Sequence, residues 1–154
     1  MKRKMMIGAG ALLGVVIGLL LVTATIWPVL NSVETGKTPE YPEVLPLYFS
    51  ADAQRVFDEV EASVGALDGW TVQTSERETL TVRAERTSSL FGFVDDVELT
   101  VKPATEFVTV VEAKSSSRVG KGDFGQNARN ITDVFEELGR RLGAVKFDPN
   151  DLKK

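Results

Sequence analysis

The chain has 154 residues, of which 18 are basic and 22 acidic, and it contains neither histidine nor cysteine. These two absences exclude Ser-His-Asp and Cys-His nucleophile pairs, thiol redox chemistry and the usual zinc or haem ligand sets, so we expect no cofactor, no metal site and no complete catalytic set. The net charge of −4 argues against nucleic acid as a partner, because phosphate binding needs a basic surface.

The N-terminal segment is strongly apolar. Residues 1–4 carry three basic side chains, no further charge occurs before Glu34, and residues 5–27 are almost wholly apolar. A helix over residues 5–27 would reach roughly 34 Å at about 1.5 Å per residue, enough to cross a hydrocarbon core of about 30 Å. We therefore expect a single transmembrane helix at 5–27 in the inner or plasma membrane, with residues 1–4 in the cytoplasm and the remainder outside it. The alternative is a signal peptide cleaved near Ala24, which would release a secreted protein.

Prolines are concentrated in the segment that follows. Residues 28–46 contain four of the six prolines, together with small and polar residues. This composition predicts an extended linker. We expect one soluble domain over residues 41–147, followed by a C-terminal tail at 148–154.

Two amphipathic helices enclose a set of strands in the predicted domain. After a predicted N-cap at Ser50, apolar residues recur at three- and four-residue steps up to Gly69, and a similar stripe runs from Phe124 to Leu142. Four period-two patterns lie between them, at about 70–74, 80–85, 94–102 and 106–114. The predicted fold class is α+β: a transmembrane helix, then a two-layer sandwich of helix, four-stranded antiparallel sheet and helix, with both helices on one sheet face.

The adjacent carboxylates Asp95 and Asp96 are the first candidate site. Strand alternation turns Asp95 toward the core and Asp96 outward. A buried carboxylate needs a partner, and Arg118 and Arg129 are the nearby donors. The functional interpretation is a general acid or a cation ligand; the structural one is a buried ion pair that fixes a loop to the sheet.

A second group of polar residues precedes and opens the last helix. Helix N-termini attract anions, and adjacent cations strengthen the attraction. Asp123 is itself a candidate occupant of the helix amides, so a purely structural network is the alternative. Together with the carboxylate pair, the candidate ligand-binding cluster comprises Asp95, Asp96, Ser115, Ser117, Arg118, Asp123, Asn127 and Arg129. The apolar run 90–93 is either an exposed contact patch or a core plug.

Three stretches of the sequence resemble the family known as domain of unknown function 1499. They are Tyr41-Pro42, the segment 91–97 (FGFVDDV) and the segment 115–129 (SSSRVGKGDFGQNAR). The family's signature corresponds here to Asp95, Asp96, Ser115, Ser117, Arg118, Gly120, Asp123, Gly125, Asn127 and Arg129. The chain departs from the pattern at Thr100 and Asn130, where the family often has basic residues, and this weakens an anion site. The resemblance implies a fold and a location rather than an activity.

Three functions are consistent with these features. The first is a non-catalytic interaction or scaffolding role in the cell envelope, with an envelope protein as partner. The second is binding of a small ligand, anion or lipid through the polar cluster. The third is a hydrolase that uses Asp95 and Asp96. The oligomeric state stays open.

Overall fold

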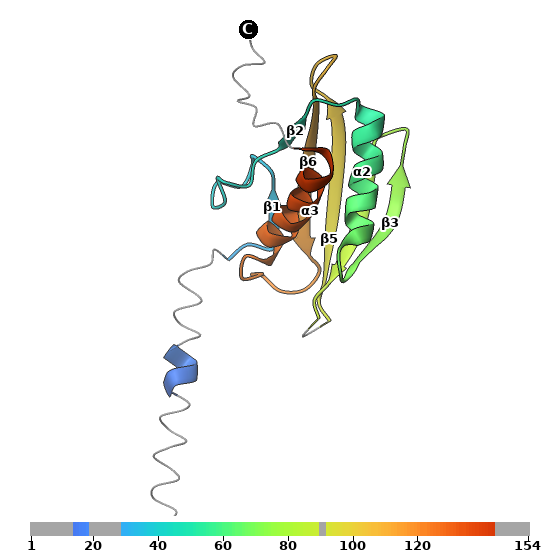
Figure 1. Cartoon of the computed structure of the whole chain (residues 1–154). Helices are drawn as coiled ribbons and strands as arrows, with labels where there is room; N and C mark the ends of the chain where they lie inside the picture. Colours follow the sequence, from blue (N-terminus) through green and yellow to red (C-terminus); the bar gives the residue numbers. More distant parts are fainter. Residues whose placement is uncertain (1–13, 19–28, 90–91, 144–154) are drawn as a thin grey trace, which may run out of the picture.

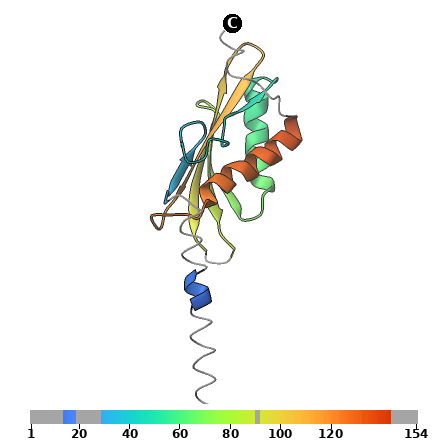
Figure 2. The ribbon, with the colours of Figure 1, turned by 90° about the vertical axis from the view of Figure 1, so that its left-hand side faces the viewer.

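The computed structural model describes residues 14–18, 29–89 and 92–143. Within these residues, six antiparallel strands form one sheet in the order β1-β6-β5-β4-β3, with β2 also paired to β6. Helices α2 (Ala53–Ala66) and α3 (Gln126–Leu142) both pack on one face of this sheet (Figures 1 and 2). The strands are β1 (Ser32–Glu34), β2 (Leu47–Phe49), β3 (Trp70–Glu76), β4 (Thr81–Thr87), β5 (Val94–Pro103) and β6 (Thr109–Ser117).

The prediction of a four-stranded sheet is wrong, because β1 and β2 precede α2 and both pair with β6. Strand β1 lies inside residues 28–46, where the sequence predicted a linker. Val33 of β1 is fully buried and Phe49 of β2 is 1% exposed. The segment is therefore part of the folded domain, which begins before Tyr41. The predicted tail at 148–154 and the N-terminal residues 1–4 lie outside the described residues.

The core lies between the sheet and the two helices. Along β5, Val97, Leu99 and Val101 are buried, while the side chains between them face the other side of the sheet. Leu99 lies opposite Val82 of β4 and Ala113 of β6. This register collects the apolar side chains of the three central strands on the face that the helices cover.

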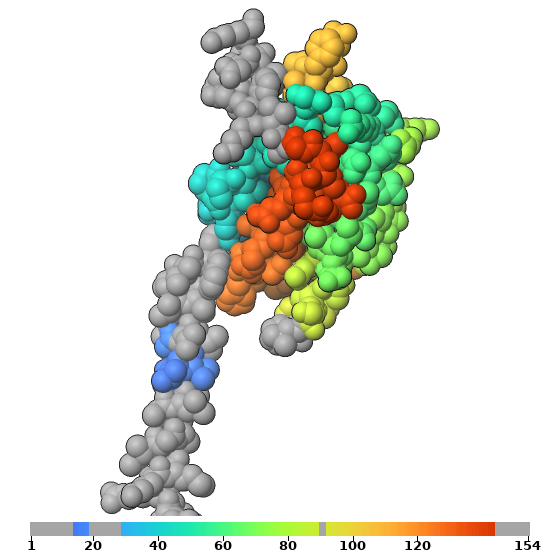
Figure 3. All heavy atoms as spheres, viewed as in Figure 1, coloured from blue at the N-terminus to red at the C-terminus, as the bar shows by residue number. Residues whose placement is uncertain are grey.

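Each helix contributes one apolar stripe to this core. In α2 the stripe contains Val56, Val60 and Val64, and α3 buries Ile131 and Leu138. Drawn as spheres, the two helices cover the sheet face that is turned to the viewer (Figure 3).

The N-cap of α2 is Asp52 rather than the predicted Ser50. The Asp52 carboxylate accepts a hydrogen bond from the Arg55 amide at 2.9 Å. It therefore satisfies one of the amides that a helix start leaves without an intrahelical partner.

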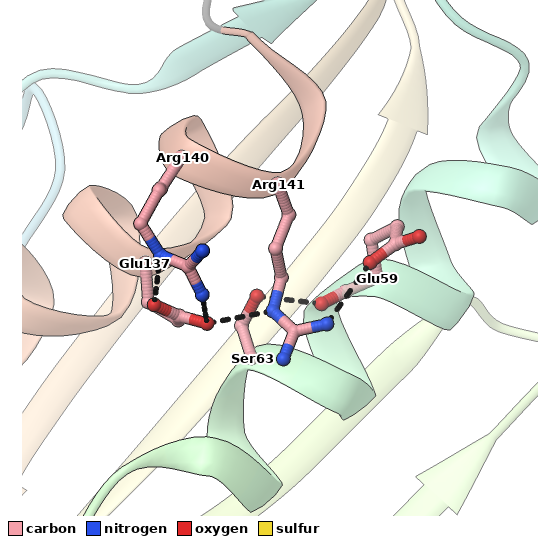
Figure 4. A network of polar contacts seen from close by, with 5 residues as sticks. All are labelled: Glu59, Ser63, Glu137, Arg140 and Arg141. Atoms are coloured by element: carbon pink, nitrogen blue, oxygen red, sulfur yellow. Dashed lines mark hydrogen bonds and ion pairs between the residues drawn. The ribbon is translucent and has the colours of Figure 1, made fainter.

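Ion pairs join the two helices near the C-terminal end of α3. Glu137 accepts hydrogen bonds from Arg140 at 2.7 and 2.9 Å and from Arg141 at 2.7 Å (Figure 4). Arg141 also reaches Glu59 of α2 at 3.4 Å. These hydrogen bonds lower the pKa of Glu137 to about 2, with Arg140 as the larger cause. The two arginines also lie where the helix dipole favours positive charge.

The predicted transmembrane helix at 5–27 is corrected by this structure. Among the described residues, none of the helices combines the length and the apolar character needed to cross a membrane. The described part of that segment is a short helix at residues 14–18, and the remainder, 5–13 and 19–27, lies outside the described residues. The predicted membrane localisation rested on this helix and is withdrawn with it.

Candidate functional site

The predicted polar cluster is divided between the two faces of the sheet. Asp95 on β5 is only 5% exposed and faces the helices, whereas Asp96 is exposed on the opposite face. This follows from strand alternation. The two carboxylates therefore belong to different sites.

Arg118 pairs with Asp96 rather than with Asp95, which corrects the predicted ion pair. Its guanidinium donates to both Asp96 oxygens at 2.6 and 2.9 Å and also contacts the Glu85 carboxylate. Glu85 lies directly opposite Asp96 in the β4–β5 register. The hydrogen bonds that Arg118 donates to Asp96 and then to Glu85 raise the pKa of Arg118. Arg118 thus holds together two like charges that would otherwise repel each other across the strands.

The open sheet face around Arg118 contains a shallow hollow of about 400 Å³. Its charged side chains are largely paired with each other: Arg83 donates to Glu98 at 2.8 Å and to Glu76 at 2.7 Å. The charged side chains in the hollow therefore largely neutralise one another. Such a surface is typical of a solvated sheet face.

On the helix side, a buried polar network connects Asp95 to the start of α3. Asn130 Nδ2 donates to Asp95 Oδ2 at 2.9 Å and to Ser115 Oγ at 3.1 Å. Ser115 Oγ donates to Asn127 Oδ1 at 2.6 Å, and Asn127 Nδ2 donates to Ser117 Oγ at 3.0 Å. Ser115, Asn127 and Asn130 have no exposed surface. The network satisfies polar groups that would be costly to bury alone.

Asn130 is a site residue that sequence reasoning missed. The sequence marks it only as a departure from the family pattern, yet it is the partner of Asp95. Its spacing carries a usable signal, because positions 127 and 130 are three apart and lie on the same side of a helix as Ile131 and Val134, which face the core.

Asp123 accepts hydrogen bonds from the backbone amides at the start of α3. Its two carboxylate oxygens accept from the Gly125 amide at 3.0 Å and from the Asn127 amide at 2.6 Å. The N-cap position itself is Gly125, which adopts a left-handed conformation with φ of 75°. Because Asp123 already satisfies two of these amides, this helix start offers an external anion less than the sequence suggested.

A pocket of about 370 Å³ lies where β5 begins, β6 ends and α3 begins. We call it the α3 pocket. It is lined by Ser88, Phe93, Val94, Asp95, Ser117, Val119, Gly120, Gly122, Asp123, Phe124, Gln126 and Arg129. It therefore unites four of the eight predicted site residues, Asp95, Ser117, Asp123 and Arg129. Ser115 and Asn127 lie in the buried network, while Asp96 and Arg118 lie on the other sheet face.

Large apolar side chains are exposed around this pocket. Phe93 is 55% exposed, Val119 66% and Phe124 57%. Phe93 is thus a surface residue rather than a core plug, whereas residues 90 and 91 lie outside the described residues. Arg129 donates to the Phe124 carbonyl at 3.0 Å and to Gln126 Oε1 at 3.2 Å. The pocket therefore has an apolar rim and contains the buried carboxylate of Asp95.

Tyr41 places a buried hydroxyl near the same end of α3. This hydroxyl has no hydrogen-bond partner among the described residues. Burial, and to a smaller extent the Asp123 charge, raise the pKa of Tyr41. In the part of the chain that the structure describes, no group of three or more acidic side chains is arranged to hold a metal ion.

The family described as protein of unknown function (DUF1499) matches residues 24–138 of the chain. The chain belongs to this family. Every residue of the candidate cluster falls inside the matched range, and so does β1, which precedes the predicted start of the domain. Because DUF1499 has no assigned function, membership alone assigns none to this chain.

Two solved structures resemble the DUF1499 chain. One is the di-domain ARO/CYC StfQ from the steffimycin biosynthetic pathway, with 13% identity and a TM-score of 0.48 over 63% of this chain and 43% of that chain. The other is TTHA0849 from Thermus thermophilus, with 13% identity and a TM-score of 0.41 over 72% of this chain and 96% of that chain. The chain thus spans less than half the length of StfQ. Neither similarity indicates a function, and none of the curated proteins compared matches the chain.

Proposed function

We propose that this DUF1499 chain is a small-ligand-binding domain and that the α3 pocket is its site. The observation that carries the proposal is that three signature residues line one pocket together with exposed aromatic rings: Asp95 from the segment 91–97, and Asp123 and Arg129 from the segment 115–129. The volume of about 370 Å³ falls in the range of about 300–1,000 Å³ that is usual for small-molecule sites.

The pocket favours a ligand with an apolar body. Phe93, Val119 and Phe124 leave more than half of their surfaces in water. Covering such surface is favourable by about 25 cal/mol per Å². The polar groups of the ligand would meet Asp95, Ser117 and Arg129, which lie in the same pocket.

The other functions suggested by the sequence have weaker support. An anion site at the cluster would lack Arg118, which lies on the opposite sheet face. It would also lack two amides at the start of α3, because these already donate to Asp123. A hydrolase would need Asp95 and Asp96 at one substrate, and they face opposite sides of the sheet. The interaction role with an envelope protein stays a prediction.

The test is to titrate the full-length chain with 4-phenylbutan-1-ol, which carries an apolar ring and a neutral head. Amide resonances followed by NMR should shift in a saturable manner, with the largest changes at Val119 and Gly120. No saturable change, or changes confined to the open sheet face around Arg118, would contradict the proposal.

A variant separates ligand binding from folding. Phe124 has a positive φ of 52°, so Phe124→Gly removes the ring while relieving backbone strain. Its affinity for the alcohol should fall about fivefold, corresponding to the loss of about 1 kcal/mol of apolar contact, without a loss of stability. The matched control is Phe107→Ala, because Phe107 is 74% exposed in the β5–β6 loop at the opposite end of these strands. It should leave the affinity unchanged.

A further inference from the structure

Asp95 is a buried carboxylate that forms no ion pair within the described part of the chain. Its Oδ2 atom accepts a hydrogen bond from the neutral amide of Asn130 at 2.9 Å. Its Oδ1 atom receives no hydrogen bond from the described residues. Because Asp95 is only 5% exposed and lines the α3 pocket, the pocket is the side from which a further partner can reach it.

Three arginines of the surrounding elements, Arg86, Arg118 and Arg129, form no ion pair with Asp95. Arg118 is bound to carboxylates on the opposite face of the sheet. Arg129 donates to a backbone carbonyl and to the neutral Gln126 side chain. Arg86 lies opposite Asp95 in the β4–β5 register but forms no ion pair with it. The positive charge of Arg86 acts instead on Asp133 of α3. Burial raises the pKa of Asp133, and Arg86 partly offsets this rise.

The charge balance of the α3 pocket is negative. The charged side chains that line it are Asp95, Asp123 and Arg129. The hydrogen bonds to Asp123 come from backbone amides, which leave its negative charge in place. Aromatic rings at the rim, such as Phe93 and Phe124, also attract cations through their faces.

We propose that the ligand of the α3 pocket carries a primary amine or a similar cationic head that donates a hydrogen bond to Asp95, while its apolar body covers Phe93 and Phe124. This inference rests on the proposed ligand-binding function and names the chemical class of the ligand. A buried charge is costly without a counter-charge, and a cation entering the pocket supplies one. Charge-assisted hydrogen bonds are also about twice as strong as neutral ones.

The experiment compares three probes that share one apolar body: 4-phenylbutylamine, 4-phenylbutan-1-ol and 4-phenylbutanoate. Dissociation constants for the full-length chain are measured by isothermal titration calorimetry at pH 7. The amine should bind about tenfold more tightly than the alcohol, the change expected for one hydrogen bond to a charged group. The carboxylate should bind more weakly than the alcohol.

Two neighbouring carboxylates provide a matched pair of variants. Asp95→Asn keeps the side-chain shape and an oxygen that Asn130 can bond, and it should abolish the preference for the amine, so that the amine and the alcohol bind the variant with similar affinity. Asp96→Asn removes the same charge on the other sheet face and should keep the preference. Should Asp95→Asn fail to fold, the Asp95 carboxyl ¹³C resonance of the wild-type chain gives the same information, because it should shift more with the amine than with the alcohol, and equal shifts would overturn the inference.

The outcomes distinguish this inference from the function on which it rests. Equal affinity for all three probes, or an amine preference that persists in Asp95→Asn, would overturn the inference and leave the binding function standing. Failure of every probe to bind would overturn both.

Discussion

Replacing Asn130 by aspartate should convert the buried network into a pair of facing carboxylates. Asn130 Nδ2 lies 2.9 Å from Asp95 Oδ2 and 3.1 Å from Ser115 Oγ, and all three residues are buried. Asn130→Asp removes the donor and places an acceptor-only group beside Asp95. The substitution changes almost no volume, so its effect is electrostatic.

The size of the destabilisation follows from two limiting cases: both carboxyl groups ionised, or one of them protonated. Two unit charges about 3 Å apart repel each other by about 5 kcal/mol at an effective dielectric constant of about 20. Keeping one carboxyl protonated instead costs about 1.4 kcal/mol per pH unit above its ordinary pKa near 3.9, or about 4 kcal/mol at pH 7. The smaller value governs, since a protonated carboxyl can still donate to Asp95. We therefore expect a loss of about 4 kcal/mol in the free energy of unfolding at pH 7.

The loss of stability in Asn130→Asp should grow as the pH rises. In the folded variant the introduced carboxyl has a raised pKa, so the stability of the variant is retained at low pH and lost as the pH rises. The deficit relative to the wild type should shrink by about 1.4 kcal/mol per pH unit between pH 7 and about pH 4.

Urea unfolding followed by circular dichroism at several pH values measures this deficit. The control is Thr132→Asp, which adds the same charge to an exposed position of α3. A deficit at pH 7 below about 1 kcal/mol, typical of a surface substitution, or one with the same pH profile as the control, would refute the reasoning.

Three further predictions concern Tyr41, Glu137 and Arg118. Tyr41→Phe removes a buried hydroxyl without a partner among the described residues and should raise the free energy of unfolding by about 1 kcal/mol. Because burial raises the pKa of Tyr41 in the folded chain, the wild type should also lose more stability than this variant when urea unfolding is repeated above about pH 10. The pKa of Glu137 is lowered to about 2 by hydrogen bonds from Arg140 and then Arg141, so its stabilising effect is present above about pH 4.5 and disappears as the pH falls toward 2. Glu137→Gln should therefore melt below the wild type at pH 6 and match it near pH 2 in thermal scans. Arg118→Ala should leave the dissociation constant for 4-phenylbutan-1-ol unchanged in calorimetry, because Arg118 lies on the face opposite the α3 pocket; a tenfold loss would show that the two faces act as one site.

The long elements of the fold were readable from the sequence because each has its own periodicity. The three- and four-residue spacing of Val56, Val60 and Val64 marks α2, and alternation through Val97 and Leu99 marks β5. Strands β1 and β2 have three residues each, too few for a period to appear. Val33 is held by its pairing with Ser115, a contact between residues far apart in the chain.

The sequence identified residues of the candidate site but not which of them contact one another. Alternation in β5 correctly separates Asp95 from Asp96, since it depends only on local geometry. Which cation meets which carboxylate depends on the chain direction after β6, and this turns Arg118 toward Asp96 and Glu85. The pairing of Asp95 with Asn130 depends on how α3 packs on the sheet, which no local pattern records.

The most direct test of the binding site is a crystal structure of the full-length chain with 4-phenylbutylamine. The ammonium group should lie within hydrogen-bonding distance of the Asp95 carboxylate, with the phenyl ring against Phe93 and Phe124. Density for the amine beside Asp96 on the open sheet face, or a bound amine whose nitrogen points away from Asp95, would contradict the account.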